Sequence, residues 1–360
     1  MKIGILSQKE EKNIDGINRV TICLMKELLN IDNKNEYSFV GKTDWLGIDM
    51  PYCDIIPNSR KTMSLNYIVN SEKYNIIHSH YKPFEFNSKL GCAKILTIYD
   101  LLVLNNKKEN LGPYDFFDKE IRKCAQNMDA IIAISENTKK DIVNSFNINP
   151  DKIKVIYLGN YTQLKYVDIK KFHDLYKKVG NNYILSVSTM RKYKNINGLV
   201  KAFCAFKEKY PDNDIKLVLT GKNDPSVDIG AEIYECMKKQ KDIVFTGYVS
   251  DEELSALYSN CIVSAFVSFY EGFGLPVLES LSFGKTVICS NTTSLPEVGG
   301  DAVEYCNPYS IESMAVAIEK VIMDEDYRKQ LEDKAYSQAS KFSYEKAARE
   351  TLELYNLFKW

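Results

Sequence analysis

Short apolar runs alternate with amphipathic stretches along the first half of the chain. The apolar runs, rich in β-branched residues, predict strands at residues 2–7, 37–40, 75–80, 93–99, 130–135 and 154–158. Apolar residues recur at helical spacing between several of these runs, at residues 20–28, 114–128 and 136–146. Alternation of this kind predicts an α/β fold, in which helices cover both faces of a parallel sheet.

The second half repeats the pattern after a stretch of mixed charge at residues 159–182, which we interpret as a linker with one short helix. Further strands are predicted at 183–188, 216–221, 243–247, 261–267, 286–290 and 302–306, and helices at 311–323, 326–340 and 344–358. A chain of 360 residues exceeds one ordinary core. We therefore predict two domains, residues 1–162 and 163–343.

Composition narrows the class of protein. A net charge of −1 argues against a nucleic-acid binder. The nine cysteines are scattered singly, which favours reduced thiols and a cytoplasmic location. The N-terminus becomes charged too early for a signal peptide, and we expect no membrane-spanning helix because no apolar run reaches about 18 residues.

The stretch at residues 261–284 carries the most informative pattern. A predicted strand runs into a turn with Gly272 and Gly274, and Pro276 suits the first position of a helix that ends near Gly284. Backbone N–H groups at such a helix start, together with the helix dipole, favour binding of a phosphate.

Two carboxylates flank this turn. Glu271 lies in the turn and Glu279 one turn into the helix, so both can face one crevice. One carboxylate would accept hydrogen bonds from sugar hydroxyls and the other from a ribose diol. The alternative is that both glutamates only offset the helix dipole.

A cluster of cations follows the strand predicted at 183–188. Arg191 and Lys194 precede a helix that begins near Asn195, and this arrangement suits a clamp for a diphosphate. A basic loop that only faces solvent is the alternative.

Polar residues end several strands of the first half, where ligands bind in parallel sheets. They are His78, His80, Tyr99, Asp100 and Ser135. We expect His78 and His80 to point to opposite faces of their strand and not to share a metal, one lining a cleft and the other serving the structure. No G-x-G-x-x-G motif follows the first strand, so a dinucleotide fingerprint is absent.

The segment EGFGLPVLES at residues 271–280 resembles the E-x7-E donor motif of the retaining glycosyltransferases of family 4. The flanking segments 245–261 and 284–310 resemble the same family, so the similarity covers about the last third of the chain. It implies a GT-B fold, in which two Rossmann-like, doubly wound parallel-sheet domains face a central cleft. The first domain would bind the acceptor, with helix 344–360 packed back on it, and the second would bind the donor.

The resemblance also implies roles for individual residues. Glu279 would bind the ribose, Glu271 would orient the donor sugar, and Lys194 and Arg191 would neutralise the diphosphate. The remaining donor contacts would come from the turn, from the loop around the nucleobase and from a glycine-rich loop in the first domain: Gly272, Phe273, Gly274, Leu275, Tyr248, Val249 and Gly16.

The chain departs from the family pattern at two positions. Tyr99 stands before Asp100 where family members have a histidine, and Thr189 stands where many have an arginine, which Arg191 would replace. Basic residues at 107–123 suggest either a membrane-docking face or a solvated helix face, and the acidic residues among them favour the second.

The resemblance implies a hexosyltransferase of bacterial cell-surface polysaccharide biosynthesis that retains the anomeric configuration and needs no metal or other cofactor. The donor would be a UDP- or GDP-sugar, and the acceptor a glycan, a lipid-linked sugar or a protein. One alternative is a non-catalytic subunit that binds a nucleotide sugar, which the exchanges at Tyr99 and Thr189 favour. A two-lobed sugar-binding protein is a second alternative, against which the cation cluster weighs.

Overall fold

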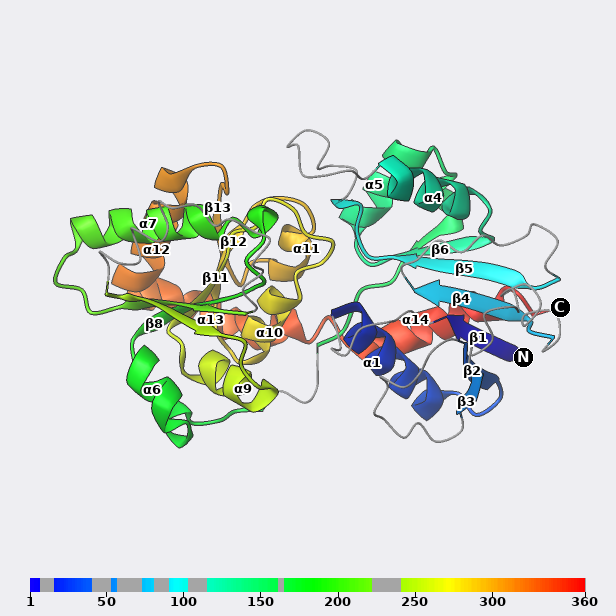
Figure 1. Cartoon of the computed structure of the whole chain (residues 1–360), viewed down its shortest axis with the longest axis horizontal. Helices are drawn as coiled ribbons and strands as arrows, with labels where there is room; N and C mark the ends of the chain where they lie inside the picture. Colours follow the sequence, from blue (N-terminus) through cyan, green and yellow to red (C-terminus); the bar gives the residue numbers. More distant parts are fainter. Residues whose placement is uncertain are drawn as a thin grey trace. The chain divides into compact units, whose positions relative to one another are not determined.

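A computed structural model describes residues 1–6, 16–40, 53–56, 73–80, 91–102, 115–160, 165–221 and 241–359. The chain divides into two compact units. The first contains Met1–Gly159 together with Phe342–Trp360, and the second contains Asn160–Lys341. The C-terminal segment therefore belongs to the unit that holds the N-terminus (Figure 1).

The first unit is built on a seven-stranded sheet in which every pairing is parallel, in the order β3-β2-β1-β4-β5-β6-β7. The strands are β1 (Lys2–Leu6), β2 (Glu36–Val40), β3 (Cys53–Ile56), β4 (Ile76–His80), β5 (Ala93–Ile98), β6 (Ala130–Ala133) and β7 (Ile153–Val155). The sequence pattern did not predict β3, which is four residues long and lies at one edge.

Helices cover both faces of this sheet, as the alternation predicts (Figure 1). On one face lie α4 (Asp115–Gln126) and α5 (Glu136–Phe146), which bury a cluster that includes Leu96, Ile131 and Phe146. On the other face α1 (Gly16–Ile31) packs against the C-terminal helix α14 (Tyr344–Asn356).

The second unit contains a six-stranded parallel sheet in the order β10-β9-β8-β11-β12-β13. Its strands are β8 (Tyr183–Val187), β9 (Lys216–Thr220), β10 (Ile243–Gly247), β11 (Val263–Phe266), β12 (Val287–Ser290) and β13 (Glu304–Cys306). Its helices are α6 (His173–Val179), α7 (Ile196–Lys209), α9 (Asp251–Asn260), α10 (Leu275–Ser282), α11 (Leu295–Gly299), α12 (Ile311–Met323) and α13 (Glu325–Ala339).

Strand β8 shows how this core is built. Its side chains alternate between faces, as in any strand. Ile184 joins the cluster beneath α7 and α12, whereas Tyr183 and Leu185 join the cluster beneath α6 and α9. Figure 1 shows these helix pairs on opposite sides of the sheet. Burial on both faces explains why apolar side chains point to both sides of the strand, with Ser186 the one polar exception.

Both sheets have the strand order of doubly wound folds, and the order reverses between β1 and β4 in one unit and between β8 and β11 in the other. The predicted α/β fold with two doubly wound parallel sheets is confirmed. Ligands of such sheets bind at the carboxyl ends of the strands beside the reversal. That rule directs attention to the loops after β8 and β11. No helix in the described ranges is long and apolar enough to cross a membrane.

Candidate functional site

The loops after β8 and β11 are joined by hydrogen bonds at the reversal point of the second sheet. The Phe269 N–H donates to the Tyr193 carbonyl at 2.8 Å. Buried Asn195 adopts a left-handed conformation, with φ of 56°, and its amide donates to the Val267 carbonyl at 3.1 Å and to the Pro308 carbonyl at 2.8 Å. These hydrogen bonds hold the two loops against each other.

Lys194 and Glu271 meet across these loops. The Lys194 Nζ lies 2.7 Å from Oε1 and 3.0 Å from Oε2 of Glu271. Their side chains are only 14% and 12% exposed, so water screens the pair weakly. The Lys194 ammonium also lies 5.0 Å from the centre of the Tyr193 ring and 5.2 Å from that of Phe266. The structure thus pairs Lys194, which was expected to neutralise the diphosphate, with Glu271, which was expected to orient the donor sugar.

The glycine turn after β11 places Glu271 beside this lysine. Gly274 has φ of 114° and begins α10 as its N-cap. A Cβ atom there would lie 2.6 Å from Leu295 Cδ2, so the turn requires glycine at this position for both conformation and space. Buried Phe273 completes the turn, and Leu275 opens the helix with Pro276 in its first turn.

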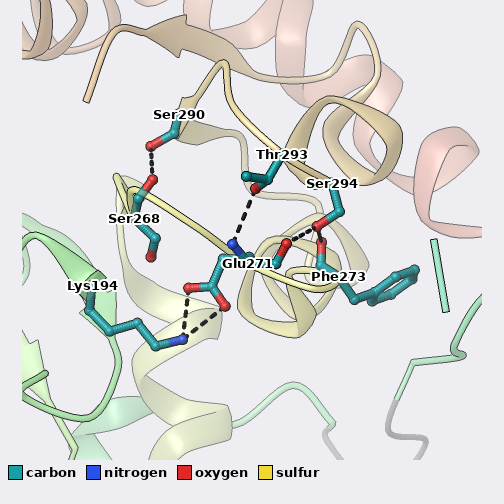
Figure 2. A network of polar contacts seen from close by, with 7 residues as sticks. All are labelled: Lys194, Ser268, Glu271, Phe273, Ser290, Thr293 and Ser294. Carbon is teal, nitrogen blue, oxygen red and sulfur yellow. Dashed lines mark hydrogen bonds and ion pairs between the residues drawn. The ribbon is translucent and has the colours of Figure 1, made fainter. Parts of the chain in front are cut away.

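Hydroxyl groups from the segment between β12 and α11 hold the same turn. The Glu271 N–H donates to Thr293 Oγ1 at 3.1 Å. Ser294 Oγ lies 2.9 Å from the Glu271 carbonyl and 2.9 Å from the Phe273 carbonyl, so its proton is shared between them. Figure 2 shows Glu271 between Lys194 on one side and these two residues on the other. Sequence reasoning missed both, although the run of hydroxyl residues at 292–294 was a visible signal.

Glu279 has a different partner from Glu271. Its Oε2 accepts a hydrogen bond from the Tyr258 hydroxyl at 2.8 Å. Burial and the Glu279 carboxylate raise the pKa of Tyr258 well above its usual value, so the phenol stays protonated. The tyrosine ring stacks on Phe283, with 5.5 Å between centroids. This contact orients Glu279 from α9, and the sequence did not predict it.

Two buried hydroxyls lie beside the same strand ends. Ser188 Oγ and Ser268 Oγ are buried and have no hydrogen-bond partner among the described residues. Buried polar atoms are almost always bonded to protein or water. Both hydroxyls therefore retain capacity to bind a ligand or water at this site.

Two of the remaining predicted donor residues of this unit, Arg191 and Tyr248, are exposed to solvent. Arg191 is exposed and occupies the N-cap position of a short 3₁₀ helix that contains Lys194. Tyr248 follows β10, the edge strand, and is 70% exposed, whereas Val249 packs against the core beneath α9.

In the first unit, Asp100 and Tyr99 follow β5. Asp100 Oδ1 accepts the Leu102 N–H at 3.0 Å. Tyr99 is buried, and its hydroxyl lies 2.9 Å from Nδ1 of His80. Gly16 is the first residue of α1. The loop before Gly16 and residues 107–114 of the basic stretch lie outside the described residues.

The expectation that His78 and His80 face opposite sides is wrong. Residues two apart on a strand share a face, and the ring centroids are 4.3 Å apart. His78 is bonded through both nitrogens, to the Tyr355 hydroxyl at 2.6 Å and to Thr97 Oγ1 at 2.7 Å. His80 Nε2 has no partner among the described residues, and the residue lines a cavity of about 20 Å³.

Burial keeps both histidines neutral. Burial lowers the pKa of His80 to about 3. Burial also lowers the pKa of His78 well below its ordinary value, and the neighbouring His80 lowers it further. Both rings therefore act as neutral hydrogen-bonding groups inside the first unit. Across the described ranges, no group of three or more His, Cys, Asp or Glu side chains could hold a metal ion.

Comparison with known proteins gives two family matches. The family described as "Glycosyl transferases group 1" matches residues 167–338, and "Glycosyltransferase Family 4" matches residues 49–163. The O-antigen chain mannosyltransferase B of Escherichia coli is 30% identical over 249 residues, which cover 67% of this chain and 64% of that protein. The serotype-specific mannosyltransferase WbdA of Escherichia coli is 31% identical, and the match covers 72% of this chain but only 33% of WbdA.

Solved structures share the fold. A glycosyltransferase from Rickettsia africae superimposes with a TM-score of 0.77 at 20% identity, covering 99% of this chain and 98% of that one. Anabaena HepE, solved with UDP and glucose, gives a TM-score of 0.73 at 17% identity and covers 99% of each chain. Together with the two family matches, these results identify the chain as a member of the glycosyltransferase family 4 group, with the GT-B fold.

Proposed function

We propose that this protein transfers a hexose from a nucleotide-diphosphate sugar to a glycan acceptor, with retention of anomeric configuration and without a metal ion. The observation that carries the proposal is the Lys194–Glu271 pair, which lies beside a glycine turn and a helix start at the reversal point of a doubly wound sheet. The named relatives are mannosyltransferases, so mannose is the first sugar to test, with UDP or GDP as the nucleotide.

The donor would bind through its diphosphate at the start of α10, where backbone dipoles favour an anion. Lys194 and Arg191 would offset its charge, which grows on the leaving phosphate as the glycosidic bond breaks. Lys194 is already fixed and partly dehydrated by Glu271, so little reorganisation is needed during the reaction. Glu279, oriented by Tyr258, would accept hydrogen bonds from the ribose.

Glu271 would orient the donor sugar through its hydroxyls. The acceptor hydroxyl then attacks the anomeric carbon from the face that the phosphate leaves, and a phosphate oxygen of the leaving group takes the acceptor proton. The new glycosidic bond forms as the bond to phosphate breaks, so the nucleoside diphosphate leaves with that proton.

The first unit would bind the acceptor. We propose that Asp100, which follows β5, borders the acceptor site. Tyr99 would support this strand end rather than carry protons, since its hydroxyl is held by His80 inside the unit. That contact also favours a second candidate function, a subunit that binds the donor without turnover.

The test is a thermal-shift screen with UDP-, GDP-, ADP- and dTDP-sugars, followed by an assay for transfer of the sugar. A ligand at about 100 times its Kd should raise the melting temperature by about 5–10 °C. Lys194→Ala should abolish most of this shift, whereas Lys329→Ala, an exposed lysine of α13, should keep it. A shift without transfer in any acceptor extract would favour the non-catalytic subunit, and no shift with any donor would refute both functions.

A further inference from the structure

Thr293 has an unfavourable backbone conformation next to the proposed donor site. Its φ is 54°, in the left-handed region. Positive φ occurs among the described non-glycine residues at Lys73, Asn147, Asn195 and Thr293, and Thr293 alone of these is β-branched. Asparagine tolerates this region, whereas a β-branched residue there is a true outlier. The segment between β12 and α11 therefore carries strain that glycine would relieve.

The segment with this strained residue forms hydrogen bonds to the backbone of Glu271. Thr293 Oγ1 accepts the N–H of Glu271 at 3.1 Å, and Ser294 Oγ, which is fully buried, lies 2.9 Å from the Glu271 carbonyl. Two consecutive residues thus bond the backbone N–H and the backbone C=O of one glutamate (Figure 2). Glycine could supply the conformation at position 293 but not the hydroxyl.

Neighbouring hydroxyls bond the rest of the loop after β11. Ser290 Oγ donates to the Ser268 carbonyl at 2.8 Å, and Thr292 Oγ1 donates to the Phe269 carbonyl at 3.3 Å. The loop is therefore bonded at successive points to the end of β12 and to the segment that follows it. Among Ser290, Thr292, Thr293 and Ser294, only Thr293 has a left-handed backbone conformation.

We propose that Thr293 is a positioning residue for Glu271, a role that rests on the proposed sugar transfer. Its hydroxyl fixes the peptide of Glu271, and that peptide sets where the carboxylate meets both Lys194 and the donor sugar. Strained residues cluster at functional sites because the surrounding structure holds them there. The strain at position 293 is the cost of placing a hydroxyl at the Glu271 N–H.

Thr293→Gly separates this role from a purely structural one, because it relieves the backbone and removes the hydroxyl together. We expect its melting temperature to equal or exceed that of the wild type, while kcat falls by about tenfold to hundredfold at a nearly unchanged donor KM. Thr293→Ser restores the hydroxyl and should recover most of kcat. Asn147→Gly is the matched control, since Asn147 is left-handed at the end of α5 in the other unit and should keep the wild-type kcat.

The outcomes separate this inference from the proposed function. If the wild type transfers sugar and Thr293→Gly does so equally well, the positioning role is wrong and the function stands. A loss of kcat in Thr293→Gly that Thr293→Ser does not recover would also contradict the positioning role. If the wild type is inactive with every donor, the function fails. In that case, amide hydrogen exchange at Glu271 tests the positioning role. The exchange should be faster in Thr293→Gly than in the wild type and should stay slow in Thr293→Ser. Equal exchange in both variants would show that the positioning role is wrong.

Discussion

The two units place polar side chains at comparable points of their sheets but use them differently. In the first unit, His78 and His80 on β4 are buried and bond to Tyr355, Thr97 and Tyr99. In the second, the Lys194–Glu271 pair lies in the loops beyond β8 and β11 and retains some exposure. The first network is neutral and the second is charged.

The comparison shows how one fold can use polar residues for stability or for chemistry. Groups on the strand itself are covered by helices, and burial then favours their neutral form. Groups in the loops beyond the strand ends can keep a charge and face a ligand. The strained backbone of Thr293 belongs to the charged network, because its hydroxyl accepts the Glu271 N–H. We therefore expect changes in the second network to alter activity and changes in the first to alter stability.

The largest expected effect is that of Glu271→Gln on turnover. The substitution keeps the size of the side chain but removes the charge that holds Lys194 and orients the sugar. We expect kcat to fall by about a hundredfold, because small displacements of a reacting group cost factors of this order. Steady-state transfer kinetics would measure it. Glu312→Gln, an exposed glutamate of α12, is the control for loss of one negative charge and should keep wild-type kcat.

A smaller effect is expected from the pH dependence of stability. The folded protein holds His80 neutral down to a pKa of about 3, whereas the unfolded chain binds the proton near pH 6.5. Unfolding therefore takes up a proton as the pH falls between these values, and stability drops by up to about 1.4 kcal/mol per pH unit for each such histidine.

His80→Gln should remove the pH-dependent loss of stability that His80 causes. The melting temperature of the full-length variant should therefore fall less steeply with decreasing pH than that of the wild type. The readout is a set of melting curves between pH 7 and pH 4. His173→Gln, an exposed histidine of the second unit, controls for loss of a histidine at the surface. Parallel curves for His80→Gln and the wild type would show that His80 is not held neutral.

The sequence pattern was sufficient for the fold because each sheet is buried on both faces. Runs such as residues 183–185 have to be apolar when helices cover both faces of the sheet, so their positions are visible without a structure. The edge strand β3 was missed because its sequence, CDII, has Asp54 within the apolar run and so lacks the continuous apolar pattern of a buried strand. The glycine turn could be predicted because Gly274 needs a left-handed backbone, which few other residues adopt.

The contacts within the site could not be predicted in this way. The Lys194–Glu271 and Glu279–Tyr258 contacts join residues far apart in sequence, and only the order of the strands brings them together. The face shared by His78 and His80 is a different case, because the alternation of side chains along a strand predicts it. The role of Thr293 depends on its backbone angle, which a hydroxyl-rich loop does not reveal.

The central claim is that the turn at Glu271 and the start of α10 bind the diphosphate of a nucleotide sugar. A crystal structure of the protein with a bound nucleoside diphosphate tests it most directly. The account predicts that the diphosphate lies against the 271–275 turn, with the Lys194 ammonium within hydrogen-bonding distance of a phosphate oxygen. Nucleotide bound elsewhere, with the turn and Lys194 free of it, would contradict the account.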